Sequence, residues 1–366
     1  MTKQLITHSR QHSFKSCRRR HWWEYEIGLR KETDAKALRM GTAGHAGLEV
    51  LGKGGSRDEA EAAVYALYEH VPEGMDEYDW RIEAETVACL VAGYAWRWSE
   101  MRLEHLATEQ AFRLPLKNPA TGAPSTVFEL GGKIDGIVRL EDGRLAVLEH
   151  KFVSEDIGQD SDYWQRLQLD HQISLYVYAA RELGYDVDTV LYDVVRKPTI
   201  KASPVPVVDG AGLKIVVDAD GKRIFNKPRK KADLEAGVLG PPRQTADKEK
   251  GYILRTRPMG FTEWGEKLMA DLTARPEWYF ARQEIARLDS DVWEMRDELW
   301  DVQKTLRDAQ LKQRWFRTVG RDTCPYCPFF GLCSSRFDPS NGEAPEGFVL
   351  LDNKHPELEG THDGKQ

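Results

Sequence analysis

Two carboxylates and a lysine lie where two segments with strand-like alternation meet. Asp135 lies in Gly132-Lys-Ile-Asp135, and 14 residues later the chain reads Glu149-His150-Lys151. Side chains two residues apart in a strand point to the same face, so Glu149 and Lys151 share a face and a tight turn can bring Asp135 beside them. Carboxylate oxygens bind Mg²⁺ or Mn²⁺, and a neighbouring ammonium can stabilise a phosphoryl transition state. The pattern predicts metal-dependent phosphodiester hydrolysis.

A solvated strand face is the alternative interpretation, because Glu-x-Lys alone is a weak signal. Apolar residues precede and follow this pair, which indicates a buried central strand. Unpaired charges at the end of such a strand are unfavourable, so their presence calls for a function. We expect Asp135, Glu149 and Lys151 to be catalytic, and the backbone carbonyl of His150 to add a metal ligand.

The elements that must position these residues follow from the periodicity of the chain. Segments between residues 109 and 153 alternate as strands, with a hairpin turn at Glu141-Asp-Gly-Arg144. A further strand is predicted over 190–195. Helices are predicted over 13–29, 41–51, 57–70, 81–106, 162–183 and 262–313. The fold class is therefore α/β, with a central mixed sheet of about five strands flanked by helices.

We expect one domain over residues 1–337 and a flexible tail over 338–366. Within the domain, 46–108 is a helical insertion, 109–196 the catalytic core, 197–260 a loop-rich insertion, and 261–337 the C-terminal helices and cysteine cluster. Apolar residues from Ile285 to Leu306 repeat at steps of three and four. This repeat indicates a long helix packed on the domain, and a dimerising coiled coil is the alternative.

Three of the five cysteines crowd together as Cys324-x₂-Cys327-x₅-Cys333. Three thiolates need a fourth ligand, and Cys17 is the best candidate, whereas Cys89 lies in an apolar helical stretch and is expected in the core. Four thiolates fit either zinc or an iron–sulfur cluster.

Composition and charge exclude several classes of protein. The chain has 366 residues, 52 Lys and Arg against 59 Asp and Glu, and a net charge of −7, which argues against a protein that coats DNA without regard to sequence. Its 41% hydrophobic content fits a folded protein, and it has neither an apolar run long enough for a membrane span nor a signal peptide. We expect a cytoplasmic protein, in the host cytoplasm if phage-encoded.

The order of Asp135 and Glu149-His-Lys151 resembles the PD-(D/E)XK nucleases, whose core is a restriction-endonuclease-like α/β fold. Three further matches resemble the RecB-type exonuclease branch. These are His45 in Gly41-Thr-Ala-Gly-His45, where the branch has a metal-binding histidine; Glu109, resembling an acidic residue before the first core strand; and Gln172-x-x-x-Tyr176 on the following helix. The resemblance implies a metal site of His45, Asp135, Glu149 and His150, with Gln172 and Tyr176 contacting DNA or supporting catalysis.

One N-terminal and three C-terminal cysteines around such a core resemble the iron–sulfur nucleases of this branch. These include the AddB nuclease domain, the nuclease of CRISPR adaptation and phage-encoded relatives. The resemblance implies a 4Fe-4S cluster on Cys17, Cys324, Cys327 and Cys333 that ties the two ends of the domain together. No helicase motif accompanies the core, which indicates a stand-alone nuclease.

The expected substrate is DNA, single-stranded or at ends, cut exonucleolytically in recombination or repair. Lys15, Arg18, Arg19 and Arg20, beside Trp22 and Trp23, could contact phosphates and stack bases. The alternative is that these tryptophans pack under the cysteine cluster. A recombinase or single-strand-binding protein is a possible partner. Two other hypotheses remain. One is a protein with the nuclease fold that binds DNA or a recombinase without catalysis, and the other is a structural or interaction protein whose four cysteines bind zinc.

Overall fold

A computed structural model describes residues 3–101, 103–337 and 342–358 of the chain. The chain divides into two compact units, and each is described by itself. Unit 1 consists of Met1–Lys197 and Leu272–Gln366, and unit 2 of Pro198–Asp271.

A mixed six-stranded sheet forms the centre of unit 1, in the order β1-β4-β5-β6-β11 with β3 also paired to β4. The strands are β1 (Gln4–Ile6), β3 (Glu104–Lys117), β4 (Pro124–Arg139), β5 (Leu145–Val153), β6 (Val187–Arg196) and β11 (Phe280–Ala286). Neighbouring pairs β3·β4, β4·β5 and β6·β11 are antiparallel, whereas β1·β4 and β5·β6 are parallel. The predicted α/β class and mixed sheet are confirmed.

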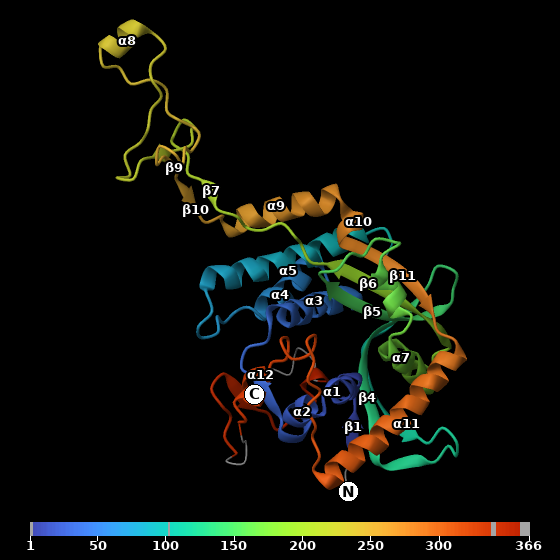
Figure 1. Cartoon of the computed structure of the whole chain (residues 1–366). Coiled ribbons are helices and arrows are strands. Elements are labelled where there is room, and N and C mark those ends of the chain that lie inside the picture. Colours follow the sequence, from blue (N-terminus) through green and yellow to red (C-terminus); the bar gives the residue numbers. More distant parts are fainter. Residues whose placement is uncertain (1–2, 102, 338–341, 359–366) are drawn as a thin grey trace. The chain divides into compact units, whose positions relative to one another are not determined.

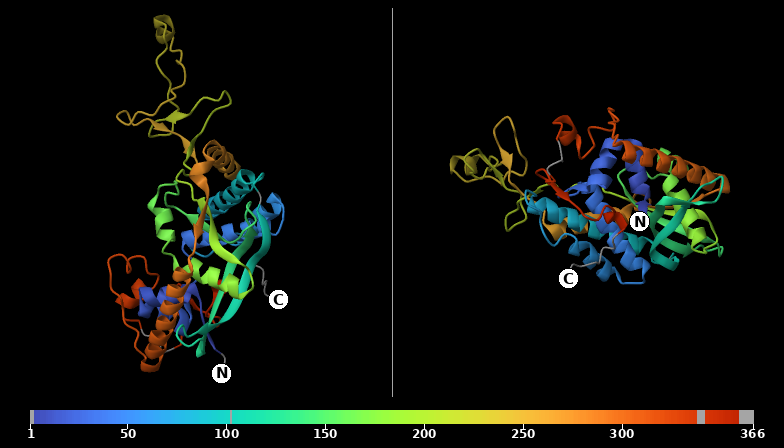
Figure 2. Two further views of the ribbon diagram at one scale, coloured as in Figure 1. Left: turned by 90° about the vertical axis from the view of Figure 1, so that its right-hand side faces the viewer. Right: turned by 90° about the horizontal axis from the view of Figure 1, so that it is seen from below.

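Helices cover both faces of this sheet (Figures 1 and 2). One face carries α3 (Lys36–Gly52), which packs with α4 (Arg57–Ala66) and α5 (Glu77–Arg97). The other carries α7 (His171–Glu182), on which α11 (Asp289–Lys312) packs. Side chains fix where these helices start: Ser56 forms a capping box with Glu59 before α4, and the Asp76 carboxylate accepts the backbone N–H of Asp79 at the start of α5.

Four helix predictions were wrong in their extent. The helix predicted over 81–106 is α5, which ends at Arg97, and strand β3 already begins at Glu104. The helix predicted over 13–29 is α1 (His8–Ser16), α2 (Arg18–His21) and a π-helix, η1 (Trp22–Ile27), with extended backbone at Cys17 between α1 and α2. The helix predicted over 162–183 is α6 (Asp162–Leu167) and α7, because the Asp170 carboxylate caps the start of a second helix. The helix predicted over 262–313 is α9 (Phe261–Ala274), α10 (Pro276–Tyr279), β11 and α11.

The apolar repeat near residue 300 packs against the main hydrophobic core. Val292, Met295, Leu299 and Leu306 on α11 are buried with residues of α7 and the sheet, which supports the packed-helix interpretation. Ile285 belongs to β11 and not to this helix.

The segment predicted as a loop-rich insertion, 197–260, falls largely in unit 2. This unit contains two short strand pairs, β7 (Val205–Pro206) with β10 (Thr256–Arg257) and β8 (Val216–Val217) with β9 (Ile253–Leu254). It also contains the short helix α8 (Lys231–Glu235) and most of α9.

The C-terminal part of unit 1 carries α12 (Phe330–Ser334), β12 (Phe348–Leu350) and a 3-10 helix, η3 (Pro356–Leu358). Strand β12, within the segment predicted as a tail, pairs antiparallel with β2 (Leu29–Lys31). Of the predicted tail, 338–366, residues 338–341 and 359–366 lie outside the described residues. Among the helices of the described ranges, none is long and apolar enough to cross a membrane.

Candidate active site

Asp135 and Glu149 lie beside each other on neighbouring strands. The β4–β5 register pairs Gly136 with Leu148, which places the preceding Asp135 against Glu149. The backbone N–H of His150 donates to Asp135 Oδ2 at 2.8 Å and holds that carboxylate against β5. The hairpin that produces this register turns at Gly143, whose φ of 88° suits glycine. The sequence-predicted strand–turn–strand arrangement is thus present.

Glu109 and His45 complete an acidic cluster around Asp135. Glu109 lies on β3 between Thr108 and Gln110, which pair with Gly136 and Ile134, so it faces Asp135 across the two strands. His45 Nδ1 lies 3.6 Å from Asp135 Oδ2. One ligand atom from each of these three side chains lies within 4.8 Å of the others, a spacing that can hold a metal ion. The sequence suggested Glu109 only through the family resemblance and gave no geometric reason for it.

Backbone features on both sides make this cluster possible. Glu109 adopts a φ of 52°, which is unfavourable for a residue with a side chain and is typical of functional positions. On α3, a Cβ atom at Gly44 would lie 2.2 Å from the Phe152 ring of β5. Only glycine lets the helix approach β5 so closely, and this approach brings the adjacent His45 to the sheet.

Lys151 belongs to a chain of polar contacts that continues onto α7. Its ammonium lies 2.5 Å from Glu149 Oε1 and donates to Gln172 Oε1 at 2.9 Å. The Gln172 amide in turn donates to the hydroxyl of Tyr176, a largely buried residue, at 3.0 Å. Gln172 and Tyr176 therefore fix the position of the Lys151 ammonium, which is the support that their spacing on one helix face suggested.

Burial sets the electrostatics of the site. It raises the pKa of Asp135 to about 7, with the neighbouring Glu109 charge adding to the effect. Burial also raises the pKa of Glu149 to about 7, although Lys151 opposes the shift. Burial lowers the pKa of His45, so its imidazole is neutral and able to act as a ligand. The carboxylates carry their negative charge readily only when a cation is near.

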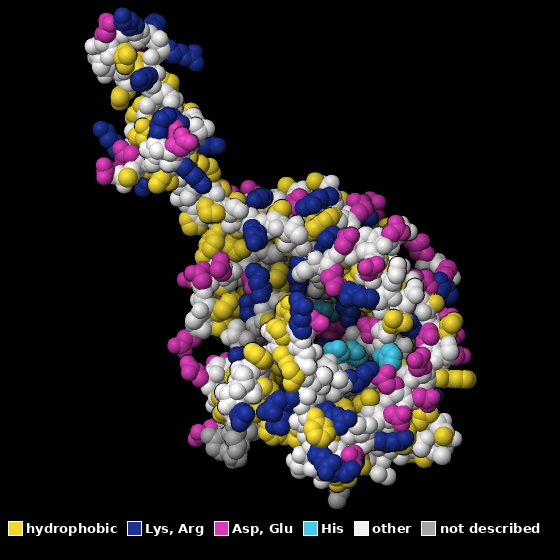
Figure 3. Space-filling model, in the orientation of Figure 1, with side chains coloured by type: hydrophobic (Ala, Val, Ile, Leu, Met, Phe, Trp, Pro, Cys, Tyr) yellow, Lys and Arg dark blue, Asp and Glu magenta, His cyan; other side chains and the backbone are white. Residues whose placement is uncertain are grey.

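A divalent cation fits these residues. Within the described part of the chain, Glu149 Oε2 is buried and has no hydrogen-bond partner, although its companion oxygen contacts Lys151. An orphaned carboxylate oxygen, two further carboxylates and a neutral imidazole form the oxygen-rich donor set that Mg²⁺ or Mn²⁺ prefers. Figure 3 shows acidic and histidine side chains together in a hollow of this face, with Lys and Arg around it.

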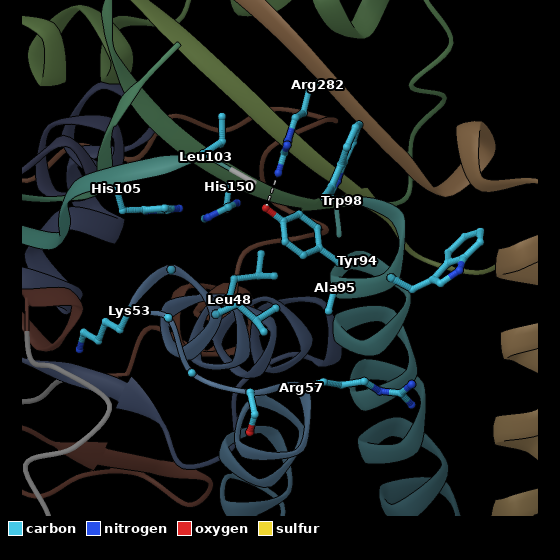
Figure 4. A pocket seen from close by; sticks show the side chains of 16 residues that line it. Leu48, Lys53, Arg57, Tyr94, Ala95, Trp98, Leu103, His105, His150 and Arg282 are labelled. Atoms are coloured by element: carbon cyan, nitrogen blue, oxygen red, sulfur yellow. Dashed lines mark hydrogen bonds between the residues drawn. The ribbon is translucent and has the colours of Figure 1, made fainter. Parts of the chain in front are cut away.

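The side chain of His150 points away from Lys151, into a second hollow of about 610 Å³ (Figure 4). Behind it lies a buried network that the sequence did not reveal. Tyr94 donates to Asp193 Oδ2 at 2.6 Å, and Arg282 donates to the same oxygen at 2.9 Å and to the Tyr94 hydroxyl at 2.9 Å. Since Asp193 pairs with His150 in the β5–β6 register, this network supports the strand that carries the site.

The cysteines are all free thiols, and among the described residues their sulfur atoms do not gather within 4.8 Å of one another. Thr318 nevertheless connects the two ends of the predicted set. Its backbone N–H lies 3.4 Å from Cys17 Sγ, and its carbonyl oxygen lies 3.9 Å from Cys324 Sγ. Burial raises the pKa of the Cys327 thiol, and the nearby Cys333 and Cys17 contribute to the rise. Cys89 is buried within α5.

The basic residues of the N-terminal helices have partners inside the protein. Lys15 pairs with Glu298 and Arg20 with Glu24, while Arg19 donates to the Trp315 carbonyl and Arg18 lies over the Phe14 ring. This geometry gives no support to the contacts with DNA that were predicted for these side chains. Trp23 is buried on Phe329, and Trp22 packs beside it with Cys327, which supports the packing interpretation of this pair.

Comparison with known proteins gives one family. The family model described as "PD-(D/E)XK nuclease superfamily" matches residues 5–334. No curated protein matches the chain. The match includes every residue of the acidic cluster and the whole six-stranded sheet except Gln4 at the start of β1.

Proposed function

The chain belongs to the PD-(D/E)XK nuclease superfamily, whose members are metal-dependent nucleases, and from that premise we propose that it hydrolyses phosphodiester bonds of DNA with Mg²⁺ or Mn²⁺. The observation that carries the proposal is the cluster of His45, Glu109 and Asp135 within 4.8 Å, beside the orphaned oxygen of Glu149. A catalytically silent relative would not need to keep buried carboxylates that oppose one another's ionisation.

His45, Asp135 and Glu149 would hold the metal, with Glu109 and the His150 carbonyl as further donors. The bound ion supplies a Lewis acid for the phosphoryl oxygen and acidifies water. The Lys151 ammonium, fixed by Glu149 and Gln172, is placed to orient the attacking water and to offset charge on the phosphate. The backbone N–H of His150 keeps Asp135 in its ligand orientation.

We further propose the RecB-type exonuclease branch, acting at single-stranded or frayed DNA ends in recombination or repair, with a phage as one source. The Gln172–Tyr176 contact and the placement of His45 on α3 support the branch assignment.

We propose that Cys17, Cys324, Cys327 and Cys333 bind a 4Fe-4S cluster. Thr318 contacts Cys17 and Cys324, and the charges of Cys17 and Cys333 contribute to the raised pKa of the Cys327 thiol.

The test is digestion of end-labelled single- and double-stranded DNA by protein purified without oxygen, with Mg²⁺ or Mn²⁺. Asp135→Ala is the inactive variant, and Asp297→Ala, which changes an exposed carboxylate of α11, is the matched control. Cleavage that needs metal and Asp135 but not Asp297 supports the proposal, and the product ladder gives polarity. If the wild type binds DNA without cutting it, the catalytically silent alternative replaces the nuclease.

A further inference from the structure

Unit 2 differs from unit 1 in the sign of its charge. Its 74 residues, 198–271, carry 14 Lys and Arg against 10 Asp and Glu, a net charge of +4. The other 292 residues carry 38 against 49, a net charge of −11. A local excess of positive charge in an otherwise acidic protein is the electrostatic pattern of a phosphate-binding surface.

The charged side chains of unit 2 face solvent. None of its charged residues is buried, and its buried apolar residues are only Val216, Met259, Trp264 and Leu268. Four of its ten acids form ion pairs: Asp209 with Arg223, Asp247 with Arg243 and Lys250, Glu263 with Arg257, and Glu235 with Lys231. In the described chain the other nine of its 14 Lys and Arg residues form no ion pair, so their positive charge is available to a ligand.

This available charge concentrates in one stretch, Lys227-Pro-Arg-Lys-Lys231, here called the basic tip. Its four cationic side chains are all exposed, and in the described chain only Lys231 has an ion-pair partner, Glu235 at 3.8 Å. Figure 3 shows Lys and Arg side chains projecting from unit 2.

The backbone around the basic tip is held in a closed loop. Phe225 pairs with Pro242, and the Asn226 N–H donates to the Pro241 carbonyl at 2.9 Å. A Cβ atom at Gly240 would lie 2.1 Å from the Asn226 carbonyl oxygen, so this close approach requires glycine. The two sides of the loop therefore meet just before the basic tip, which presents four cations on a short, constrained segment.

We propose that the basic tip is a second DNA-binding site, which contacts backbone phosphates through residues other than those of the acidic cluster. This inference rests on the proposed function for its choice of ligand. Phosphate contacts carry no base information, so the tip would hold DNA of any sequence. Because the tip and the acidic cluster belong to one chain, DNA bound at the tip has a raised effective concentration at the cluster.

The test compares two full-length variants that lose the same positive charge. The tip variant carries Lys227→Ser, Arg229→Ser, Lys230→Ser and Lys231→Ser. The control variant carries four substitutions on and just after α11, all at exposed or half-exposed positions: Lys304→Ser, Arg307→Ser, Lys312→Ser and Arg314→Ser. Both are made in an Asp135→Asn background so that a tailed DNA duplex is bound but not cut, and thermal melting confirms that each is folded.

Binding is measured from about 50 to about 200 mM salt. Four phosphate contacts contribute about −3.6 to the slope of the logarithm of the DNA association constant against the logarithm of the salt concentration. Across this range the Asp135→Asn parent should therefore lose ~150-fold more affinity than the tip variant. The control variant should keep the steep slope. In the active protein, the tip substitutions should lower the ratio of kcat/KM on long DNA to kcat/KM on a hexanucleotide.

Equal slopes for the tip variant and the Asp135→Asn parent would overturn the inference and would point to a protein partner for unit 2. An equal loss in the tip and control variants would overturn it too, since general charge would then explain the effect. The two proposals can fail separately. Tip-dependent binding without any cleavage contradicts only the nuclease, whereas cleavage of DNA with tip-independent binding contradicts only this inference.

Discussion

Replacing Asp135 with asparagine should stabilise the metal-free protein at alkaline pH while abolishing its response to metal. The Asp135 carboxyl is mostly buried and faces Glu109, which together raise its pKa from 3.8 to about 7. A carboxyl whose pKa is higher in the folded state binds more protons when folded. Its contribution to the free energy of unfolding is therefore fully present below about pH 3.8 and is lost as the pH rises through about 7.

The magnitude follows from the same shift. One pKa unit corresponds to about 1.36 kcal/mol, so a rise from 3.8 to about 7 sets an upper limit of about 4 kcal/mol. Water reaches the 12% of the side chain that is exposed, which screens part of this effect. We expect about half, ~2 kcal/mol. For a chain of 366 residues, an unfolding entropy of about 2.1 cal/mol/K per residue converts this to a rise in Tm of about 3 °C for Asp135→Asn at about pH 8.

The assay is thermal and chemical denaturation in EDTA, at about pH 5 and about pH 8, then with Mg²⁺ or Mn²⁺. The gain in the free energy of unfolding of Asp135→Asn should appear at the higher pH and shrink at the lower pH. Metal at 100 times its Kd should stabilise the wild type by about 2.7 kcal/mol and the variant far less. Asp297→Asn, at an exposed position of α11, is the control. A variant that is less stable than the wild type in EDTA at about pH 8 would refute this reasoning.

Three further changes test other parts of unit 1. Arg282→Leu leaves Asp193 buried without its cation and should lower the free energy of unfolding by about 3–5 kcal/mol in urea titrations; a loss below about 1 kcal/mol would contradict the network's role. Gln172→Ala frees the Lys151 ammonium and should lower kcat by about 10- to 100-fold with KM and Tm nearly constant, whereas a change in KM alone would indicate a binding role. Cys17→Ala should remove the visible absorbance of the cluster and lower Tm, while the control Cys89→Ala, on α5, should keep the absorbance. Colourless wild-type protein that contains zinc would refute the cluster.

Local patterns in the sequence predicted the centre of the site. Alternation placed Glu149 and Lys151 on one face of β5, and the Asp-Gly turn fixed the register that brings Asp135 beside them. These features depend on residues within one hairpin, so periodicity and turn chemistry were sufficient. The same holds for Gln172 and Tyr176, which are one helical turn apart.

Features that depend on distant parts of the chain were missed. Strand β11 was predicted as helix because Ile285 fits the apolar repeat of the helix that follows, and its partner β6 lies about 90 residues earlier in the sequence. The left-handed backbone of Glu109 has no sequence signal, since glycine or asparagine would ordinarily mark such a position. The Tyr94–Asp193–Arg282 network joins three elements whose polar residues looked like ordinary surface positions.

The charges of unit 1 oppose both its own stability and its proposed substrate. Asp135 and Glu149 are placed where burial disfavours their ionised forms, and the unit as a whole carries a net charge of −11. Stability alone would select neutral residues at these positions. A bound divalent cation reverses the local effect, since it stabilises the ionised carboxylates and attracts a phosphate. It does not reverse the repulsion of the remaining acidic surface from DNA, and the net positive charge of unit 2 offsets that repulsion on the same chain. Metal at the acidic cluster and an intact basic tip should therefore each strengthen DNA binding, independently of the other.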